Sequence, residues 1–383
     1  MSSASIRWRI LGDVGVAAVF TAITCMHLVF GADRGGAGRD NRALAAKPQL
    51  PIDLDGVAGY IRGLEKWFDD HFAFRAQLQS LHARICLDVF GVSPTSQVVI
   101  GEQGWLYYTK QGVFPDRRGE NSLGDDACAA WRAELEQRQA FLRERGVPYV
   151  FAVVPNKETI HPEHLPARHL PVSGRPTRLD QLVRCFAEGS SFRLLDGRPL
   201  LAGVARERQA YHATDSHWNE IGAFVFYRAL VDELRSQGLA IEAVAADRFT
   251  PVKRPFHGDL GLLVPWLNTP AEAGWLMTPL APHPSQRVDL GFDHRALPPA
   301  WNVWDPPVAH VCPGQPGVLL FVGDSFQWPM IPWLARHFGA SVFLSVAVTD
   351  FAVFRQLVEI VKPTAVIEER AERNMAFPPT RRR

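Results

Sequence analysis

Hydrophobic and polar positions divide the chain into an N-terminal helical part and a longer part in which strands are expected. Between Val57 and Phe90 apolar side chains recur at helical spacing, which predicts one or two amphipathic helices. Gln97 to Tyr108 holds two short runs of β-branched and aromatic residues around a glycine-containing turn, which predicts two short strands. A further helix is expected over Trp131 to Arg145, closed by Gly146.

From Val147 onward the pattern alternates between buried strands and helices. The stretch VPYVFAVVP, which begins at Val147, is apolar throughout, as is typical of a strand covered on both faces of a parallel sheet. After it we expect a helix at Arg178 to Glu188, a strand at Phe192 to Leu195 ending in Asp196, and a helix that Gly238 ends.

The same alternation returns near the C-terminus, where GVLLFVGDSF contains a buried run that ends in Gly323. We expect after it a helix to Phe338, a strand at Ser341 to Val346, a helix at Phe351 to Val361 and a strand at Thr364 to Ile367. Because strands alternate with helices in both halves, the sequence predicts an α/β domain with a mostly parallel sheet. Residues 240 to 310 are rich in proline and lack clear periodicity, so they are expected to form an irregular insertion with short strands.

The N-terminus has the pattern of an exported protein. Arg7 and Arg9 precede the apolar run Val14 to Phe30, as in a signal peptide or a membrane anchor. We favour an uncleaved helix in the inner membrane, with the rest of the chain in the periplasm, because the positive charges lie on the N-terminal side and a polar tether follows. Cleavage after Gly31 is the alternative. The expected organisation is an anchor or signal peptide (residues 1–31), a linker (32–56) and one domain (57–383).

Composition excludes some functions without naming one. The 383 residues carry a formal net charge of +1, which gives no basic field for binding nucleic acid. His161, Glu163, His164 and His169 lie on a proline-rich stretch without helical or hairpin register, so we expect neither a metal site nor a cofactor.

The cysteines are interpreted as buried small hydrophobic residues. They show no CxxC motif and no zinc spacing, and their odd number argues against a disulfide framework. At most two bridges could form among the four outside the N-terminal segment, and the pattern predicts no pairing. The five residues are Cys25, Cys86, Cys128, Cys185 and Cys312.

A nucleophilic serine is indicated where the buried run that ends in Gly323 meets the next helix. Ser325 lies just past this run, where a tight turn presents a side chain at the carboxyl end of the sheet. The first N–H groups of a helix are unpaired, so that of Phe326, together with that of Ser325 itself, is a candidate oxyanion donor.

The base and its orienting acid are expected from the motif Asp215-Ser216-His217. In an extended segment entering a helix, the carboxylate of Asp215 can hold the imidazole Nδ1–H of His217 while Nε2 faces the serine. Taken alone, such a motif is more often a helix cap with an incidental histidine. Ser216 lacks a turn that would expose it, so we do not expect it to be the nucleophile.

The order of these motifs resembles that of the SGNH hydrolases with its halves exchanged, as in a circular permutation. In that family Gly-Asp-Ser follows the first strand and Asp-x-x-His precedes the last helix. The permuted pattern resembles the alginate O-acetyltransferases of the exported AlgJ and AlgX type from Trp67 to Arg373. The matching stretches are WFDDHFAFR (Trp67 to Arg75), GEQGWLYY (Gly101 to Tyr108), VVPNKETIHPEHLP (Val153 to Pro166), TDSHWNEIGA (Thr214 to Ala223), GDLGLL (Gly258 to Leu263), GDSF (Gly323 to Phe326) and KPTAVIEERAER (Lys362 to Arg373).

This resemblance implies an SGNH-hydrolase-like (flavodoxin-like) sheet with helices on both faces. It implies that Ser325 is the nucleophile, His217 the base and Asp215 its orienter in acetyl transfer to hydroxyls of an alginate-like exopolysaccharide through an acyl-serine. A membrane-bound O-acyltransferase partner would supply the acetyl group. The alternatives are a carbohydrate acetylesterase with the same three residues, and a non-catalytic scaffold that binds polysaccharide or an acyltransferase.

The chain departs from the broader family at its oxyanion donor. The Asn of the Gly-x-Asn-Asp block is missing, because the third strand ends in Glu368-Glu369-Arg370. Asn156, Lys157 and Arg373 are the candidates for this role or for substrate contact, although Asn156 and Lys157 would equally suit a turn with a solvated lysine. Trp328 is a candidate for lining a sugar groove, or a packing residue. The chain stops ten residues after Arg373, without the carbohydrate-binding module of the AlgX branch, so the AlgJ-like branch fits better.

Overall fold

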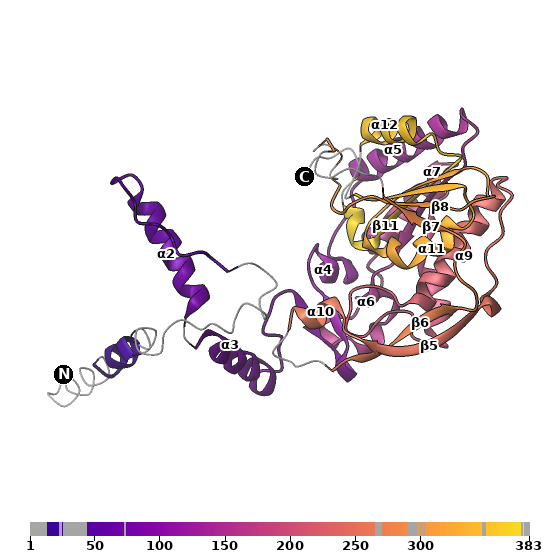
Figure 1. Ribbon diagram of the computed structural model, residues 1–383. Coiled ribbons are helices and arrows are strands. Elements are labelled where there is room, and N and C mark those ends of the chain that lie inside the picture. Colours follow the sequence, from indigo (N-terminus) through magenta and orange to yellow (C-terminus); the bar gives the residue numbers. More distant parts are fainter. Residues whose placement is uncertain are drawn as a thin grey trace. The chain divides into compact units, whose positions relative to one another are not determined.

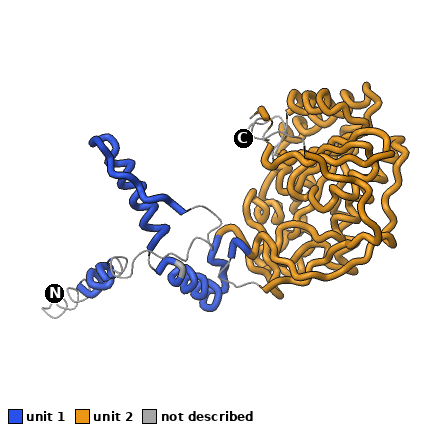
Figure 2. Tube along the Cα trace, viewed as in Figure 1, with its two compact units in different colours: residues 1–95, 262–269 blue, residues 96–261, 270–383 orange. Residues whose placement is uncertain are grey.

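The computed structural model describes residues 14–22, 25, 44–72, 74–264, 270–289, 297–298, 301, 303–346, 350–376 and 378. The chain divides into two compact units (Figure 2). The first comprises residues 1–95 and 262–269, and the second comprises residues 96–261 and 270–383.

The first unit contains the helices predicted between Val57 and Phe90. They are α2 (Val57–His71) and α3 (Arg75–Arg84), and a single π-helical turn, η2 (Ile85–Val89), follows α3. Residues 14–22 are also helical, and the remainder of the predicted anchor, apart from residue 25, lies outside the described residues. Within the part of the chain that the structure describes, no helix has both the length and the apolar character needed to cross a membrane.

In the described part of the second unit, seven strands form one sheet in the order β4-β3-β11-β9-β10-β8-β7. The pairs among the first five are parallel, whereas β8 and β7 extend one edge as antiparallel strands. The strands are β3 (Tyr149–Val154), β4 (Leu195–Asp196), β7 (Gln286–Val288), β8 (Val308–Val311), β9 (Val318–Gly323), β10 (Ala340–Ser345) and β11 (Ala365–Ala371). The prediction of an α/β fold with a mostly parallel sheet is therefore confirmed.

The strand order explains where a ligand site can form. Read in the sequence β9, β10, β11, β3 and β4, the parallel strands have the spatial order 2-1-3-4-5 of a doubly wound sheet. The chain enters this order at its fourth strand, as the exchange of halves predicts. The order reverses between β9 and β11, and ligands bind at the carboxyl ends of strands flanking such a switch point.

Helices cover both faces of the sheet (Figure 1). One hydrophobic core lies beneath α5 (Asp125–Arg143), α7 (Arg178–Gly189) and α12 (Phe351–Val361). The other lies beneath α8 (Arg198–Ala205), α9 (Glu220–Ser236) and α11 (Ile331–Ala335). These elements follow the predicted pattern, although α5 begins six residues before Trp131, and α8 was not predicted.

A disulfide joins Cys128 on α5 to Cys185 on α7, with 6.2 Å between the Cα atoms. The interpretation of all five cysteines as free hydrophobic residues is therefore wrong for this pair. Sequence pattern alone could not find it, because the pairing depends on the packing of α5 against α7. Of the free cysteines, Cys312 is buried as expected, whereas Cys86 is half-buried and Cys25 is exposed.

The predicted insertion at residues 240 to 310 is more regular than its proline content suggests. β5 (Phe249–Phe256) and β6 (Glu272–Pro279) form an antiparallel pair over their full length, and α10 (Asp259–Leu262) begins within the connection. The pair is anchored to α9, where the Met277 N–H donates to Glu220 Oε2 at 2.6 Å. β7 and β8 also come from this region, so it completes the sheet and covers the loop before α9.

Candidate active site

Ser325 follows β9 at the switch point of the sheet and begins the 3-10 helix η10 (Ser325–Met330). The preceding Asp324 fixes the turn: its carboxylate accepts the N–H groups of Phe326 at 3.2 Å and Ala371 at 2.9 Å, and the Asn374 side chain at 3.0 Å. A Cβ at Gly323 would lie 2.8 Å from a carboxylate oxygen of Glu369, so any larger residue would displace the side chain that accepts the Asp324 N–H. The side chain of Ser325 is consequently presented at the carboxyl end of the sheet.

His217 joins this serine to Asp215. Its Nε2 lies 2.7 Å from Ser325 Oγ, and its Nδ1 lies 2.7 Å from Asp215 Oδ1. Because an ionised carboxylate can only accept, we assign the proton to Nδ1, which leaves Nε2 free to accept the serine proton. Burial alone would raise the pKa of Asp215, but the hydrogen bond and the charge of His217 outweigh burial and hold it well below its usual range.

The loop that carries Asp215 is held by two side chains, the buried Lys157 and the half-buried Glu272. The carboxylate of Glu272 accepts the N–H groups of Ala213 at 2.7 Å and Thr214 at 2.8 Å. The ammonium of Lys157, on α6 (Lys157–Ile160), donates to the carbonyl oxygens of Ala213 and Asp215, both at 2.8 Å. Burial lowers the pKa of Lys157 to about 7, against the opposing charges of Glu272 and Asp215. Lys157 is thus neither solvated nor an oxyanion donor; it supports the loop.

The predicted backbone oxyanion donors differ in their surroundings. The Phe326 N–H already donates to Asp324 Oδ1, whereas the Ser325 N–H makes no hydrogen bond to another described residue. The Phe326 side chain is fully buried and its ring centroid lies 4.8 Å from that of His217 and 5.2 Å from that of Trp218. The Ser325 N–H is therefore the better candidate donor, and Phe326 packs the base in place.

Arg373 and Asn156 lie together at the carboxyl ends of the strands, the same end of the sheet as Ser325. The Arg373 N–H donates to Asn156 Oδ1 at 3.3 Å, and the Arg373 guanidinium lies 5.1 Å from the Phe326 ring and 5.8 Å from the Tyr108 ring. This guanidinium forms no hydrogen bond or ion pair with any residue that the structure describes. Its side-chain N–H groups are therefore not taken up by described residues, while its charge partly offsets the buried Glu158 and Glu369.

The two tryptophans after Ser325 have different environments. Trp333 is 2% exposed and packs against Phe224 and Phe249, which identifies it as a core residue. Trp328 is 38% exposed on η10, directly downstream of the serine. Of the two, Trp328 has the exposed surface that contact with a bound molecule requires.

Sequence reasoning missed the contribution of Asp259 at the start of α10. Asp259 Oδ2 lies 3.6 Å from His217 Nδ1, and Asp259 Oδ1 accepts the Ser216 N–H at 2.7 Å. The signal was present in the GDLGLL motif, which the resemblance used without assigning a role to its acid.

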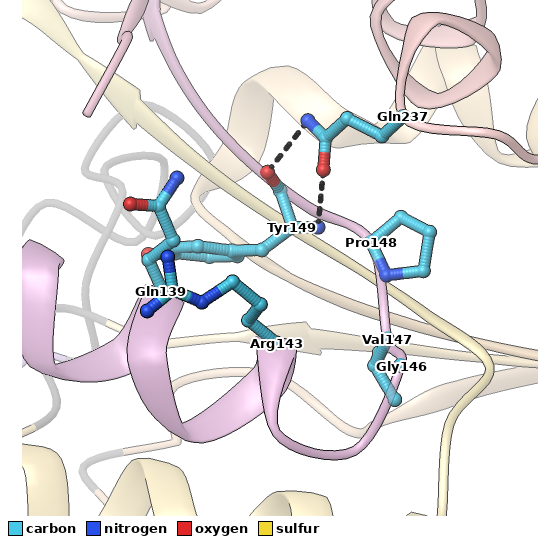
Figure 3. Close-up of a pocket in the computed structure, with 7 residues that line it drawn as sticks. All are labelled: Gln139, Arg143, Gly146, Val147, Pro148, Tyr149 and Gln237. Carbon is cyan, nitrogen blue, oxygen red and sulfur yellow. Dashed lines mark hydrogen bonds between the residues drawn. The ribbon is translucent and has the colours of Figure 1, made fainter. Parts of the chain in front are cut away.

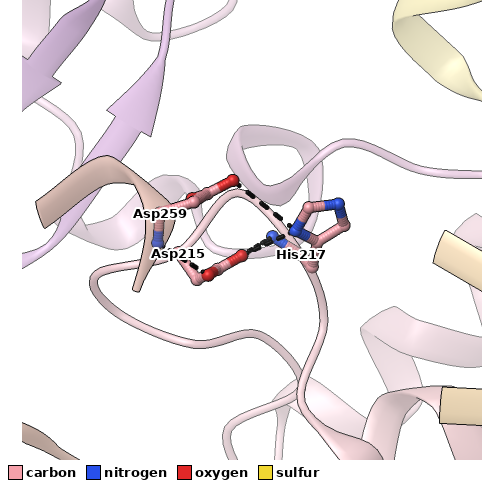
Figure 4. A group of neighbouring side chains, drawn as sticks. All are labelled: Asp215, His217 and Asp259. Atoms are coloured by element: carbon pink, nitrogen blue, oxygen red, sulfur yellow. Dashed lines mark hydrogen bonds and ion pairs between the residues drawn. The ribbon is translucent and has the colours of Figure 1, made fainter. Parts of the chain in front are cut away.

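Asp215, His217 and Asp259 also form the one group of described residues whose ligand atoms, all within 4.8 Å of one another, could surround a metal ion (Figure 4). Each carboxylate already accepts hydrogen bonds from the loop: Asp215 from the His217 and Asp259 N–H groups, and Asp259 from Ser216. This hydrogen-bond pattern suits a site that holds and moves a proton, and an ion would have to displace it.

A separate surface pocket lies at the amino end of β3, lined by Gln139, Arg143, Tyr149 and Gln237 among others (Figure 3). Gln237 accepts the Tyr149 N–H at 2.9 Å and donates to the Tyr149 carbonyl at 3.0 Å. Because β3, β11 and β9 are parallel, this pocket lies at the amino ends of the strands, whereas Ser325 lies at their carboxyl ends. None of the predicted site residues lines it.

The strand order and the position of the serine define an α/β protein of the SGNH-hydrolase-like class. Residues 98–289, half of the chain, match the family model described as "SGNH hydrolase-like domain, acetyltransferase AlgX". The chain therefore belongs to this AlgJ/AlgX-like family, and the predicted family is confirmed.

Two curated relatives, each named "Probable alginate O-acetylase AlgJ", match part of the chain. That of Pseudomonas aeruginosa is 32% identical over 174 residues, which cover 44% of this chain and 41% of the relative. That of Pseudomonas syringae pv. tomato is 26% identical over 208 residues, 54% of this chain and 51% of the relative. The chain thus spans about half the length of the curated relatives that it matches.

A solved structure shares the fold at low sequence identity. The structure of Bacillus cereus PatB1 with a sulfonyl adduct superposes with a TM-score of 0.51 at 17% identity, covering 73% of this chain and 97% of that one. This likeness shows that the fold shared with that structure extends over most of the chain.

Proposed function

We propose that the protein is an O-acetyltransferase that moves an acetyl group through Ser325 to hydroxyl groups of an alginate-like exopolysaccharide. The observation that carries this proposal is the line of contacts from Ser325 Oγ to His217 Nε2 and from His217 Nδ1 to Asp215, each 2.7 Å long. Its place in a domain of the acetyltransferase AlgX family and the names of the curated relatives support acetyl as the group and alginate as the type of acceptor.

In the first half-reaction Ser325 Oγ attacks the carbonyl carbon of the acetyl donor while His217 Nε2 takes the serine proton. Asp215 stabilises the imidazolium, and the Ser325 N–H is placed to donate to the oxyanion. The bond to the donor's leaving oxygen then breaks, and this oxygen takes the proton from His217. The product is an acetyl ester of Ser325.

In the second half-reaction a sugar hydroxyl attacks the acetyl-serine. His217 Nε2 takes the hydroxyl proton and returns it to Ser325 Oγ as the ester bond to the enzyme breaks. In each half-reaction one acetyl group is transferred and one proton moves the opposite way through His217, so the enzyme is restored after the second. We propose that the exposed Trp328 and the unpaired guanidinium of Arg373 contact the acceptor, Trp328 by stacking and Arg373 through acidic groups.

We further propose that the protein works in the periplasm. Two observations support an exported domain: the positively charged and then apolar N-terminal pattern, and the Cys128–Cys185 disulfide, since such bonds persist in oxidising compartments. We propose that the N-terminal segment anchors the chain to the inner membrane and that a membrane-bound O-acyltransferase supplies the acetyl group.

The test uses the purified chain with p-nitrophenyl acetate as donor and alginate oligosaccharides as acceptor, followed by mass spectrometry of the sugars. We expect acetylated oligosaccharides from the wild type, a loss of about 10³-fold or more in Ser325→Ala, and no loss in the exposed control Ser236→Ala. Release of acetate without acetylated sugar would identify an esterase instead. Full polymer acetylation in cells that carry Ser325→Ala would identify a scaffold.

A further inference from the structure

The loop that carries Asp215 and His217 is covered by the segment that follows β5. The Gly258 N–H donates to Thr214 Oγ1, and the Gly261 N–H donates to the Thr214 carbonyl, both at 3.2 Å. A Cβ on Gly258 would lie 2.1 Å from the Thr214 carbonyl and 2.4 Å from the Asp215 nitrogen. Only glycine permits this approach, and it brings the next residue, Asp259, onto the loop.

Asp259 bonds this loop through its backbone N–H and both carboxylate oxygens. Its N–H donates to Asp215 Oδ2 at 2.8 Å, and its Oδ1 accepts the Ser216 N–H at 2.7 Å. Its Oδ2 accepts the Ser216 hydroxyl at 2.6 Å. Asp259 is thus fixed against both Asp215 and the residue that joins Asp215 to His217.

The geometry around the imidazole places two carboxylates near Nδ1. Asp215 Oδ1 lies 2.7 Å from it and Asp259 Oδ2 lies 3.6 Å from it (Figure 4). Ser216 Oγ lies 3.3 Å from the same nitrogen. The Nδ1–H group therefore faces Asp215 directly and the Ser216 hydroxyl at its side. Because that hydroxyl donates its own proton to Asp259, the second carboxylate acts on the imidazole both across space and through the serine.

We propose that Asp259 is a positioning residue, a second carboxylate that orients His217 through Ser216 and stabilises its imidazolium. This role rests on the proposed acetyl transfer, in which the imidazolium forms in both half-reactions. The side chain of Asp259 is 44% exposed, so solvent screens its charge and the effect is smaller than that of Asp215, whose side chain is 10% exposed.

Other charged and titratable groups act on the same loop and are present in every variant. Lys157 and Glu272 lie beneath it, and His212, whose pKa is lowered by burial, lies beside it. Arg373 lies over the Phe326 ring that packs against His217. Because the charge of Asp259 also raises the pKa of Lys157, a shift of the acid limb alone does not identify the titrating group, and the NMR titration of the His217 ring assigns the change to the imidazole.

The experiment compares Asp259→Asn and Ser216→Ala with Asp247→Asn, an exposed acid of the same insertion on η6 (Ala246–Arg248). Two readouts are measured on the folded full chain: titration of the His217 ring by NMR, and the pH profile of kcat/KM with p-nitrophenyl acetate. We expect Asp259→Asn to lower the imidazole pKa and the acid limb of the profile by about 0.5–1 pH unit. We expect kcat at the plateau to fall about tenfold with KM unchanged, a smaller fall in Ser216→Ala, and no change in Asp247→Asn.

An unchanged His217 titration and acid limb in Asp259→Asn, even with lower activity, would overturn the proposal in favour of a purely structural role. If Asp259→Asn does not fold, the His217 titration is measured in Ser216→Ala instead, and an unchanged titration there would likewise overturn the proposal. A shifted titration in a chain that transfers no acetyl group would refute the proposed function and leave the positioning role intact.

Discussion

Two polar networks of the second unit differ in how their charges are compensated: one is buried between α5 and the sheet, and the other lies at the carboxyl ends of the strands. We call the first the scaffold network: Glu134, Arg138, Tyr149, Glu368 and Arg370. Glu368 Oε2 lies 2.6 Å from Arg138 and 2.9 Å from the Tyr149 hydroxyl, and its other oxygen lies 3.0 Å from Arg370. Burial would raise the pKa of Glu368, but the two arginines outweigh burial and lower it.

The site network consists of Lys157, Asp215, His217, Asp259 and Ser325, and its surroundings are short of compensating charge. Glu369, the neighbour of Glu368 on β11, faces Asp324 on the site side, and burial together with that acid raises its pKa well above the usual range. Burial likewise raises the pKa of Glu158 to about 8. Removal of one partner from the compensated scaffold network is costly, whereas buried acids with raised pKa values gather near Ser325, as is common at functional sites.

Removal of the central cation of the scaffold network should have the largest effect on stability. Arg138→Ala leaves Glu134 buried without its cation and Glu368 with Arg370 alone, so we expect the free energy of unfolding to fall by about 3–5 kcal/mol in urea denaturation. The control Arg143→Ala, exposed on the same helix, should change it by less than about 0.5 kcal/mol. Equal stability of Arg138→Ala and wild type would remove the distinction between the networks.

Loss of the disulfide between α5 and α7 should have the second-largest effect on stability. The Cys128–Cys185 bridge closes a loop with a sequence separation of 57, and its loss in Cys128→Ser/Cys185→Ser should cost about 3–4 kcal/mol of unfolding free energy by freeing the unfolded chain. Acetyl transfer per folded molecule should stay unchanged, since the bridge lies across the sheet from Ser325. A loss of transfer at full stability would contradict this separation of roles.

The pH dependence of stability tests whether Glu158, a buried acid near the active site, is protonated in the folded chain. The unfolded chain releases the Glu158 proton near its ordinary pKa of 4.5, whereas the folded chain holds it to about 8. Between these values the folded state binds more protons, so this group makes stability fall as pH rises. Glu158→Gln should therefore match wild type near pH 4 and be more stable at pH 8 by on the order of 3 kcal/mol.

Urea denaturation of both proteins at the two pH values measures this difference, with the exposed Glu207→Gln as the matched control. A constant difference between Glu158→Gln and wild type across the range would show that Glu158 is ionised in the folded chain.

The smallest effect is expected from chelation. Because Asp215 and Asp259 are engaged by N–H and O–H groups, we expect EDTA treatment to leave acetyl transfer unchanged. Loss of activity restored by zinc or another divalent ion would show that these acids and His217 bind a metal.

Features that lie within one stretch of sequence could be predicted, namely the strands, the helices and the two motifs. Contacts between distant segments could not. The apolar run before Gly323 and the motif at Asp215 predicted a serine and a histidine at one edge of a parallel sheet, because strand direction fixes where both segments end. The support from Asp259 required the approach at Gly258, a contact between distant segments that no periodicity encodes. Lys157 was misjudged because its position after a strand did not reveal that the Asp215 loop covers it.

The most direct test of the central claim is capture of the acyl-enzyme. The chain is mixed with p-nitrophenyl acetate, quenched rapidly in acid, digested and analysed by mass spectrometry. The account predicts one acetyl group on the peptide that contains Ser325, absent from Ser325→Ala and discharged by added oligosaccharide in the wild type. Acetyl transfer that proceeds in Ser325→Ala, or an acetyl group found on another residue and discharged in the same way, would contradict it.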